Sequence, residues 1–381
     1  MRAVAEGRIE KTSSVFATHI DRCLGCRACE QACPAGVEYG QLLEASREVL
    51  LEAQPKSDLA NRLLRFVLKH VWLSPWRLRV FFRASRLFRD LGLARLLLKS
   101  RLLPSRAEFG IALLESSKAG SRAKAQTRKV AGQAGSVMLF EGCVGEGLFA
   151  RVNRATERVL NVNGFDVKTP AEQVCCGALH AHAGDLEGAR TLARKNIAAF
   201  DSDTPIVTNA GGCGAMLVTY GHLFANDQDV AEKAKKFSAR VHDVSQQLAT
   251  VEMRTASSAV SQSVTYDTSC HLMYGQGSGE ASERMLRSVT GKDFVALNGT
   301  ERCCGAAGVY NLLQPEMSGR VLREKLDHIK DTGAGILATG NPGCQMHIGA
   351  GACLAGMKLS VCHPVEIVDQ AYQEAGYYDG S

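Results

Sequence analysis

Two sets of cysteines recur along this chain with nearly the same internal spacing, and thiolates are the side chains that soft metal ions prefer. Each set consists of one cysteine after an apolar run, a Cys-Cys-Gly sequence, and a last cysteine in a glycine-containing segment. The first set is Cys143, Cys175, Cys176 and Cys213, and the second, about 130 residues further on, is Cys270, Cys303, Cys304 and Cys344. This repetition predicts an internal duplication.

Several thiolates that arrive from separate loops suit a cluster of iron and sulfide. The glycine after each cysteine pair lets the backbone come close and donate N–H groups to sulfur. His271 follows Cys270 and His347 lies three residues after Cys344, so both are candidates for alternative ligands or for donors to the ligands. The competing interpretation is a group of buried core cysteines. That interpretation is the one we apply to Cys353 and Cys362, which lie outside both sets.

A third cysteine motif lies near the N-terminus. Its spacing, C-x2-C-x2-C-x3-C-P, is the run that bacterial ferredoxins use to hold a 4Fe-4S cluster. The cysteines are Cys23, Cys26, Cys29 and Cys33. A zinc site would more often show two separated pairs of ligands. In ferredoxins with two such motifs the cysteine before proline ligates the neighbouring cluster, so Cys33 has no cluster of its own in this sequence.

The composition limits the class of protein. The chain has 381 residues and 14 cysteines, which would suggest disulfides in a secreted protein. Residues 1–20 contain no apolar signal core, so a reducing cytoplasm is expected. No run of 18 apolar residues is present, so no segment is expected to cross a membrane.

Residues 62–106 carry an unusual excess of positive charge. Twelve arginines and lysines stand against a single acid, Asp90, and both tryptophans, Trp72 and Trp76, lie in this segment. The spacing of the cations and apolar residues predicts basic amphipathic helices with a break at Pro75. Such helices suit an anionic lipid surface or an acidic partner subunit, and the alternative is an ordinary helical layer with solvated arginines. Nothing else in the sequence supports nucleic-acid binding.

The second half of the chain alternates short apolar runs with helical patterns, which predicts parallel βαβ units. Strands are expected at residues 137–140, 205–208, 264–266, 294–297 and 335–338. The cysteines would then lie beyond the carboxyl ends of strands, where open α/β sheets bind ligands.

We therefore predict an α/β C-terminal part of two duplicated βαβ Cys-rich modules, preceded by an all-α ferredoxin-like 4Fe-4S and basic helical region. The expected domains are residues 1–115 for the helical region, 116–135 for a linker with little to pack, 136–252 for the first module and 253–381 for the second. Residues 253–263 would join the two modules.

Four segments resemble the iron-sulfur subunit of glycolate oxidase. They are residues 19–40 around the ferredoxin-type motif, residues 303–316 and 339–344 of the second module, and the His363-Pro-Val-Glu366 sequence. The resemblance implies a subunit that takes electrons from flavin-bearing partners oxidising glycolate or a similar 2-hydroxy acid and passes them to a membrane quinone or another acceptor. It also implies a Cys-rich (CCG) fold shared with heterodisulfide reductase. The expected cofactors are at least one 4Fe-4S cluster and a further cluster at the modules. The expected location is the cytoplasm, with peripheral attachment to the inner face of the cell membrane.

The broader family often ends each module in C-x-x-C, whereas this chain has Met216 and His347 at those places. Two alternative functions are open. One is a heterodisulfide reductase-like catalytic subunit, and the absence of these two cysteines weighs against it. The other is a non-catalytic metal-binding scaffold, and the ferredoxin-type motif weighs against that. In the family a first ferredoxin motif precedes a segment similar to residues 1–8. We therefore expect Met1 to be an internal methionine. The alternative is a variant with a single cluster, in which Cys33, or a cysteine of a module or of a partner, completes the ligand set of Cys23, Cys26 and Cys29.

Overall fold

The structure is a computed structural model that describes residues 1–56, 58–118, 133–256 and 262–378. Within the described part of residues 1–118 every regular element is a helix. The elements are α1 (Arg2–Ala5), α2 (Ser14–Arg22), α3 (Ala28–Gln31), α4 (Tyr39–Ala53), α5 (Leu59–Val67), the π-helix η1 (Leu68–Trp72), α6 (Pro75–Asp90), α7 (Leu93–Ser100) and α8 (Ser105–Ser116). Pro75 is the first residue of α6, where its missing N–H costs nothing, so the expected break is present.

The first module is built on a four-stranded parallel sheet in the order β2-β1-β3-β4. Its strands are β1 (Gly135–Phe140), β2 (Phe165–Lys168), β3 (Ile206–Thr208) and β4 (Val241–Asp243). Its helices are α9 (Cys143–Val162), α10 (Ala178–His182), α11 (Leu186–Ala199), α12 (Gly211–Leu217), α13 (Tyr220–Leu223), α14 (Ala231–Ala239) and α15 (Val244–Leu248). Val137, Leu139 and Val207 are completely buried, as expected for parallel strands covered on both faces.

The second module repeats this arrangement in the order β6-β5-β7-β8, again all parallel. Its strands are β5 (Val264–Asp267), β6 (Phe294–Val295), β7 (Ile336–Thr339) and β8 (Ser360–Cys362). Its helices are the π-helix η2 (His271–Gly275), α16 (Gly279–Thr290), the 3-10 helix η3 (Gly291–Asp293), α17 (Tyr310–Leu313), α18 (Pro315–Asp331), α19 (Pro342–Leu354) and α20 (Pro364–Glu374).

The identical strand orders confirm the predicted pair of duplicated parallel modules. The sequence did not indicate β2, β4 and β8, because each is a short outer strand with few apolar residues. Cys362 is buried as predicted, at the end of β8. Cys353 is exposed on α19, so its prediction as a core residue is wrong; this end of α19 turns toward solvent, where Leu354 is also exposed.

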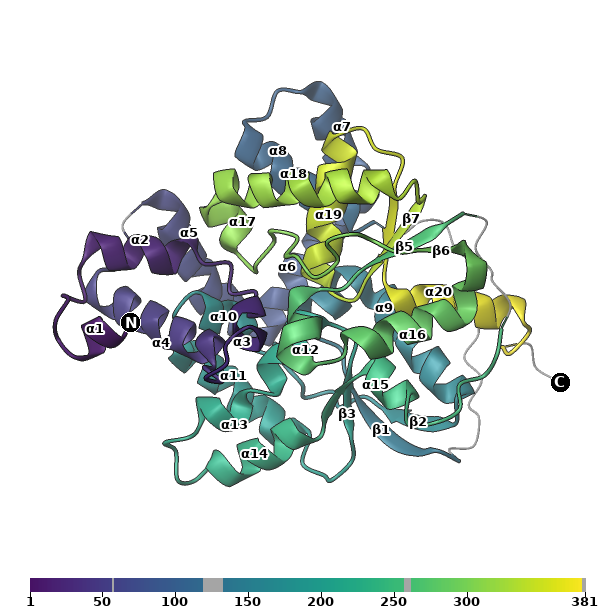
Figure 1. Cartoon of the computed structure of the whole chain (residues 1–381), viewed down its shortest axis with the longest axis horizontal. Helices are drawn as coiled ribbons and strands as arrows, with labels where there is room; N and C mark the ends of the chain where they lie inside the picture. The colour runs from purple at the N-terminus through teal and green to yellow at the C-terminus, as the bar shows by residue number, and fades with distance from the viewer. Residues whose placement is uncertain (57, 119–132, 257–261, 379–381) are drawn as a thin grey trace.

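The two modules share one hydrophobic core. Figure 1 shows α9, α16 and α20 packed between the two sheets. Val137 and Val207 of the first sheet belong to the same buried cluster as Tyr266 and Ala338 of the second. The modules are therefore joined by packing and are not two bodies on a tether.

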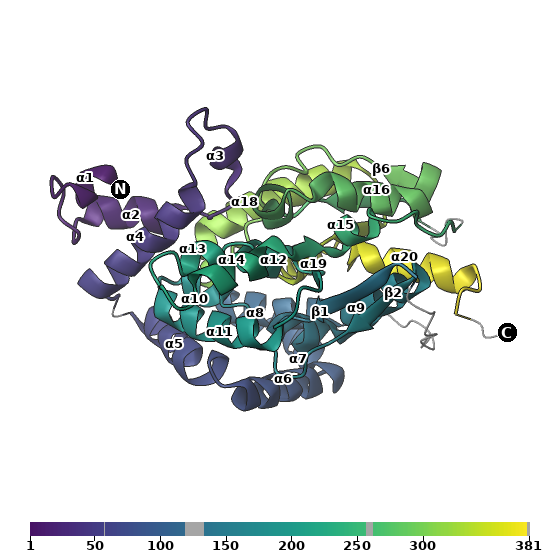
Figure 2. The same cartoon turned by 90° about the horizontal axis from the view of Figure 1, so that it is seen from below.

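The N-terminal helices hold both modules. Helix α6 packs on α9 of the first module and α8 packs on α19 of the second. Figure 2 shows α5, α6 and α7 along one outer face of the molecule, with α1, α2 and α4 projecting from one end. Ser116 still belongs to α8 and Gly135 begins β1, while residues 119–132 of the expected linker and 257–261 of the expected joining segment lie outside the described residues.

Candidate metal centres

The four cysteines of the first set meet beyond the carboxyl edge of the first sheet. Cys143 begins α9 directly after β1, Cys175 and Cys176 precede α10, and Cys213 lies in α12 after β3. The Sγ atoms of Cys143 and Cys175 are 3.3 Å apart. Cys176 interacts through hydrogen bonds with both Cys175 and Cys213, which links the whole set.

Glycine is needed beside this set. Gly142 has a φ of 69°, and a Cβ there would lie 3.3 Å from the Cys213 sulfur. Gly177 has a φ of 90°, and a Cβ there would lie 3.2 Å from the backbone of Ala189. Larger residues would strain the backbone and push apart the loops that bring the thiols together.

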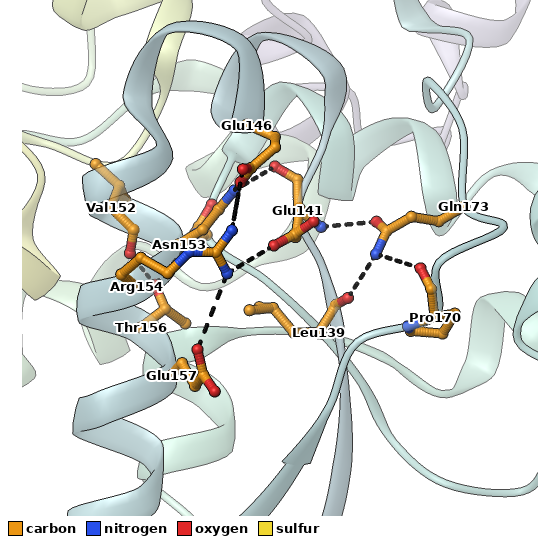
Figure 3. A network of polar contacts seen from close by, with 11 residues as sticks. Leu139, Glu141, Glu146, Val152, Asn153, Arg154, Thr156, Glu157, Pro170 and Gln173 are labelled. Atoms are coloured by element: carbon orange, nitrogen blue, oxygen red, sulfur yellow. Dashed lines mark hydrogen bonds and ion pairs between the residues drawn. The ribbon is translucent and has the colours of Figure 1, made fainter. Parts of the chain in front are cut away.

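A polar network holds the turn that carries Cys143 (Figure 3). The Glu141 N–H donates to Gln173 Oε1 at 2.9 Å, and Gln173 Nε2 donates to the carbonyls of Leu139 and Pro170. Arg154 pairs with Glu141 at 2.9 Å and with Glu146 at 3.0 Å. The network thus connects the end of β1, the start of α9 and the loop that leads to Cys175.

The second set is arranged in the same way. The Sγ atoms of Cys304 and Cys344 are 3.2 Å apart, and those of Cys270 and Cys303 are 4.0 Å apart. The chain also donates to sulfur here: the Gly305 N–H lies 3.4 Å from Cys303 Sγ, and Asn341 Nδ2 lies 3.4 Å from Cys344 Sγ. These donors stabilise negative charge on sulfur, which a thiolate ligand carries.

Hydrogen bonding between the thiols divides them by acidity. Hydrogen bonds from Cys270 and Cys304 lower the pKa of Cys303 well below its usual value. The hydrogen bonds that Cys304 makes to Cys303 and Cys344, together with burial, raise the pKa of Cys304. In the first set the hydrogen bond to Cys175 and burial raise the pKa of Cys143. Cys303 therefore accepts from two of the other thiols of its set, Cys270 and Cys304.

The N-terminal motif lies against the second set. Cys26 and Cys303 line one cavity of about 320 Å³. Burial and, in addition, the charge of Cys303 raise the pKa of Cys26. Arg47 joins the motif to the first module as well, since it donates to the carbonyl of Cys23 at 2.8 Å and to that of His182 in α10 at 3.1 Å. The Tyr310 hydroxyl donates to the Arg22 carbonyl at 3.0 Å. The sequence did not indicate which module the motif would contact.

Cys33 differs from the other cysteines of the motif. The backbone N–H groups of Val37 and Ala35 donate to its sulfur and lower the pKa of the thiol. Burial raises the pKa of Cys26 and also that of Cys29. Cys33 thus has its own backbone donors at the end of the motif.

The two candidate histidines have different surroundings. His271 Nδ1 lies 3.9 Å from Cys270 Sγ, and its ring stacks on His182 at 5.4 Å between centroids. His182 in turn contacts Glu44 of α4 at 3.2 Å, a link that nothing in the sequence indicated. His347 instead faces Asn311 and Ser318, each at 3.3 Å. Burial lowers the pKa of His271 and of His347 to about 4, so both imidazoles are neutral at pH 7.

A larger cavity of about 560 Å³ opens beside the first set. Cys143 and Cys175 line one side, and Trp72, Phe82 and three arginines of α6 line the other. The Trp72 Nε1 is buried without an oxygen or nitrogen partner, and its N–H lowers the pKa of Cys143, which places it beside that sulfur. The arginines are Arg79, Arg83 and Arg86.

The donors fit iron and sulfide better than a single ion. Among the described residues, no three histidine, cysteine or acidic side chains are arranged to hold one metal ion. Each module nevertheless gathers four thiols, of which two are buried in the first and three in the second, and the second also has backbone and amide donors to sulfur. Several soft thiolates with N–H donors to sulfur are the donor set of an iron-sulfur cluster.

Comparisons with known proteins agree with this chemistry. A family model described as a cysteine-rich domain (CCG) matches residues 137–218 and 264–349. The chain is 34% identical over 388 residues to a probable glycolate oxidase iron-sulfur subunit of Bacillus subtilis, covering 99% of this chain and 87% of that protein. It is 30% identical over 362 residues to a glycolate oxidase iron-sulfur subunit of Escherichia coli, covering 93% and 83%.

A shorter relative matches as well. The chain is 34% identical over 241 residues to lactate utilization protein A of Oceanobacillus iheyensis, covering 63% of this chain and 98% of that protein. The family match falls on the two structural modules, and the longer relatives align with nearly the whole chain. The chain therefore belongs to the family of glycolate oxidase iron-sulfur subunits.

Proposed function

We propose that this chain is the iron-sulfur electron-transfer subunit of a flavin-dependent glycolate or related 2-hydroxy-acid dehydrogenase. Substrate is oxidised at a flavin on a partner chain, and electrons leave to a quinone or another acceptor. The observation that carries the proposal is the shared cavity of Cys26 and Cys303, because it places the ferredoxin-type motif directly beside a second thiol set. Closely spaced redox centres are what an electron-transfer subunit requires.

The ligands follow from the three thiol groups. Cys23, Cys26, Cys29 and Cys33 would hold a 4Fe-4S cluster in a ferredoxin-like N-terminal region, and the two module sets would hold further clusters. His271 would interact with the Cys270 sulfur through its Nδ1, and His347 would orient Asn311 and Ser318. When bound, such clusters accept and release single electrons. The chain's own contribution is to bury the sulfurs, exclude water and supply N–H donors.

Replacement of one ligand tests this function. We expect Cys303→Ser in anaerobically purified protein to lower the iron and sulfide content and to remove one signal from the EPR spectrum of the reduced protein. The matched control is Cys353→Ser, because Cys353 is exposed and outside both sets. Unchanged iron, sulfide and EPR signals in Cys303→Ser, or zinc alone in the wild-type protein, would refute the proposal and favour a scaffold.

The partner and acceptor are tested on the assembled enzyme. Co-purification with a flavin-containing subunit, and reduction of the EPR-active centres on addition of glycolate, are the expected results. Reduction by lactate but not glycolate would assign a different 2-hydroxy acid. Failure of any flavoprotein to co-purify would contradict the assignment to such an enzyme.

A further inference from the structure

Helix α6 has two apolar faces, and only one of them is packed. Leu78 and Phe82 are buried against the first module. Trp76, Val80 and Leu87 lie on the opposite face and are 59%, 55% and 62% exposed. Their spacing of four and seven residues places them in one stripe along the helix.

The neighbouring helices extend this apolar surface. In α5, Leu59, Leu63 and Phe66 follow the same helical spacing and are 79%, 59% and 59% exposed. In α7, Leu96 is 64% exposed, and Leu102 just beyond it is 86% exposed. Figure 2 shows the three helices side by side on one outer face, which we call the α5–α7 face. Exposed apolar side chains gathered in this way mark an interaction surface.

The same face is strongly cationic. Residues 62–106 contain twelve lysines and arginines and one acid, Asp90, which pairs with Arg89 at 2.8 Å. Arg77, Arg79 and Arg83 are exposed and flank the stripe of Trp76, Val80 and Leu87. Arg89 is the exception, since it is buried and donates to Ser117 and to the Leu148 carbonyl.

We propose that the α5–α7 face docks on an anionic phospholipid surface, with its helices lying in the plane of the interface. Apolar stripes bordered by arginines match this environment, because the apolar side chains enter the acyl boundary while the guanidinium groups stay at the phosphates. A tryptophan in the stripe is suited to the same boundary. No helix among the described residues is long and apolar enough to cross a bilayer. An acidic protein surface would match the arginines, but it would also need apolar patches opposite the exposed Trp, Phe and Leu side chains of three helices.

Docking here has a consequence for the first thiol set. Arg79 and Arg83 also line the 560 Å³ cavity whose other side contains Cys143 and Cys175. A bilayer against the α5–α7 face would therefore lie next to a cavity that leads to these sulfurs. A lipid-borne electron acceptor could enter there; this step rests on the proposed function, whereas docking itself does not.

Vesicle flotation of the full chain tests the proposal. We expect association with vesicles of phosphatidylglycerol and phosphatidylcholine, weakening as salt rises and absent with phosphatidylcholine alone. Trp76→Gln with Leu87→Gln should lower the partition coefficient at least about tenfold, because both side chains would leave the acyl boundary. The matched control is Leu312→Gln with Leu354→Gln, which changes two apolar residues exposed elsewhere, at 47% and 44%.

A second pair of variants tests the charge. Arg77→Gln, Arg79→Gln and Arg83→Gln together should weaken binding by about fivefold for each arginine. Lys233→Gln, Lys235→Gln and Lys236→Gln on α14 remove the same charge from another exposed site and should have less effect. Iron content, thermal midpoint and dye reduction by the assembled enzyme should stay unchanged in the Trp76 and Leu87 variant, which separates docking from electron transfer.

Two results would overturn the proposal. One is failure of the wild-type chain to associate with phosphatidylglycerol vesicles at low salt. The other is association that the Trp76 and Leu87 variant retains in full. Loss of a partner subunit from the arginine variant, without vesicle binding by the wild type, would instead identify the face as a protein interface.

Discussion

At the residue scale, the second module contains a nearly inaccessible ion pair behind its thiols. Lys325 Nζ of α18 contacts Asp267 Oδ1 of β5 at 2.7 Å, with side chains 1% and 2% exposed. The same ammonium donates to the Gly299 carbonyl at 2.7 Å, and the Thr339 hydroxyl donates to Asp267 at 3.4 Å. Asp267 ends the strand that leads to Cys270, so the pair fixes the loop that presents this sulfur.

Removing one partner of this pair should be costly. We expect Lys325→Met to lower the free energy of unfolding by about 3–5 kcal/mol, because Asp267 is left as a buried, unpaired charge. Urea denaturation followed by circular dichroism measures the change. Lys330→Met, on the exposed side of the same helix, should alter it by less than about 0.5 kcal/mol.

The double variant separates charge from packing. Adding Asp267→Asn to Lys325→Met should restore part of the lost stability, since no buried charge then remains. A double variant less stable than Lys325→Met alone would show that the pair acts through shape and not through charge.

At the scale of elements, the loops that follow β3 and β7 are equivalent in the two modules and meet each other. The Gly211 N–H donates to the Gly340 carbonyl at 2.9 Å, and the Gly212 N–H donates to Asn341 Oδ1 at 3.1 Å. A Cβ on Gly211 would lie 2.6 Å from Ser269 Oγ. Because these loops carry Cys213 and Cys344, the contact fixes the two thiol sets relative to each other.

The start of α20 strengthens this junction through a neutral histidine. His363 Nδ1 accepts from the Val365 N–H at 3.0 Å, so Nε2 carries the proton and donates to the Asn209 carbonyl at 2.8 Å. Burial lowers the pKa of His363 to about 4, and the nearby charges are Glu366 and Arg151. The unfolded chain binds a proton near pH 6.5, so stability falls as the pH decreases from about 6.5 to 4.

His363→Asn should remove this pH dependence and keep an oxygen to cap α20. Between pH 6.5 and pH 4 the free energy of unfolding should fall less in this variant than in the wild type, and we expect the difference to be about 3 kcal/mol. Denaturation curves at several pH values would show it. His19→Asn, at an exposed position, is the control, and equal slopes for the two variants would contradict the assignment.

At the scale of the whole molecule, the modules and the N-terminal helices form one packed unit. The shared core continues from Phe149 of α9 to Ile367 of α20, and Leu78 of α6 joins it. Arg158 of α9 binds Asp369 of α20 through two contacts, at 2.8 Å and 2.6 Å. The thiol sets and the α5–α7 face are therefore held on one framework.

A cavity made in one module should destabilise the other. Ile367→Ala, at a side chain 1% exposed, should lower the unfolding free energy by about 2–5 kcal/mol. Trp72 packs against the core of the first module, so tryptophan fluorescence and far-ultraviolet circular dichroism should shift together in urea. Leu354→Ala, at an exposed site, is the control. Separate transitions by the two probes would show that the modules unfold independently.

The sequence by itself determined which side chains are candidate ligands and how they are grouped. Cysteine spacing predicted the duplication, and apolar runs before Cys143 and Cys270 predicted parallel strands with thiols at their carboxyl ends. Both are local properties, because in a parallel sheet every loop that follows a strand opens at the same edge. The outer strands β2, β4 and β8 were missed, since three or four residues carry too little periodicity.

Only the tertiary structure decided how these parts meet. The contact of Cys26 with the second module, the link from Glu44 through His182 to His271, and the burial of Asp267 against Lys325 join residues 58 to nearly 300 positions apart. The apolar residues of α5–α7 show the same limit. Helical spacing predicts that an apolar stripe needs a partner, but the packing of distant elements decides which stripe is covered. In α6, Leu78 and Phe82 are buried, whereas Trp76, Val80 and Leu87 stay exposed.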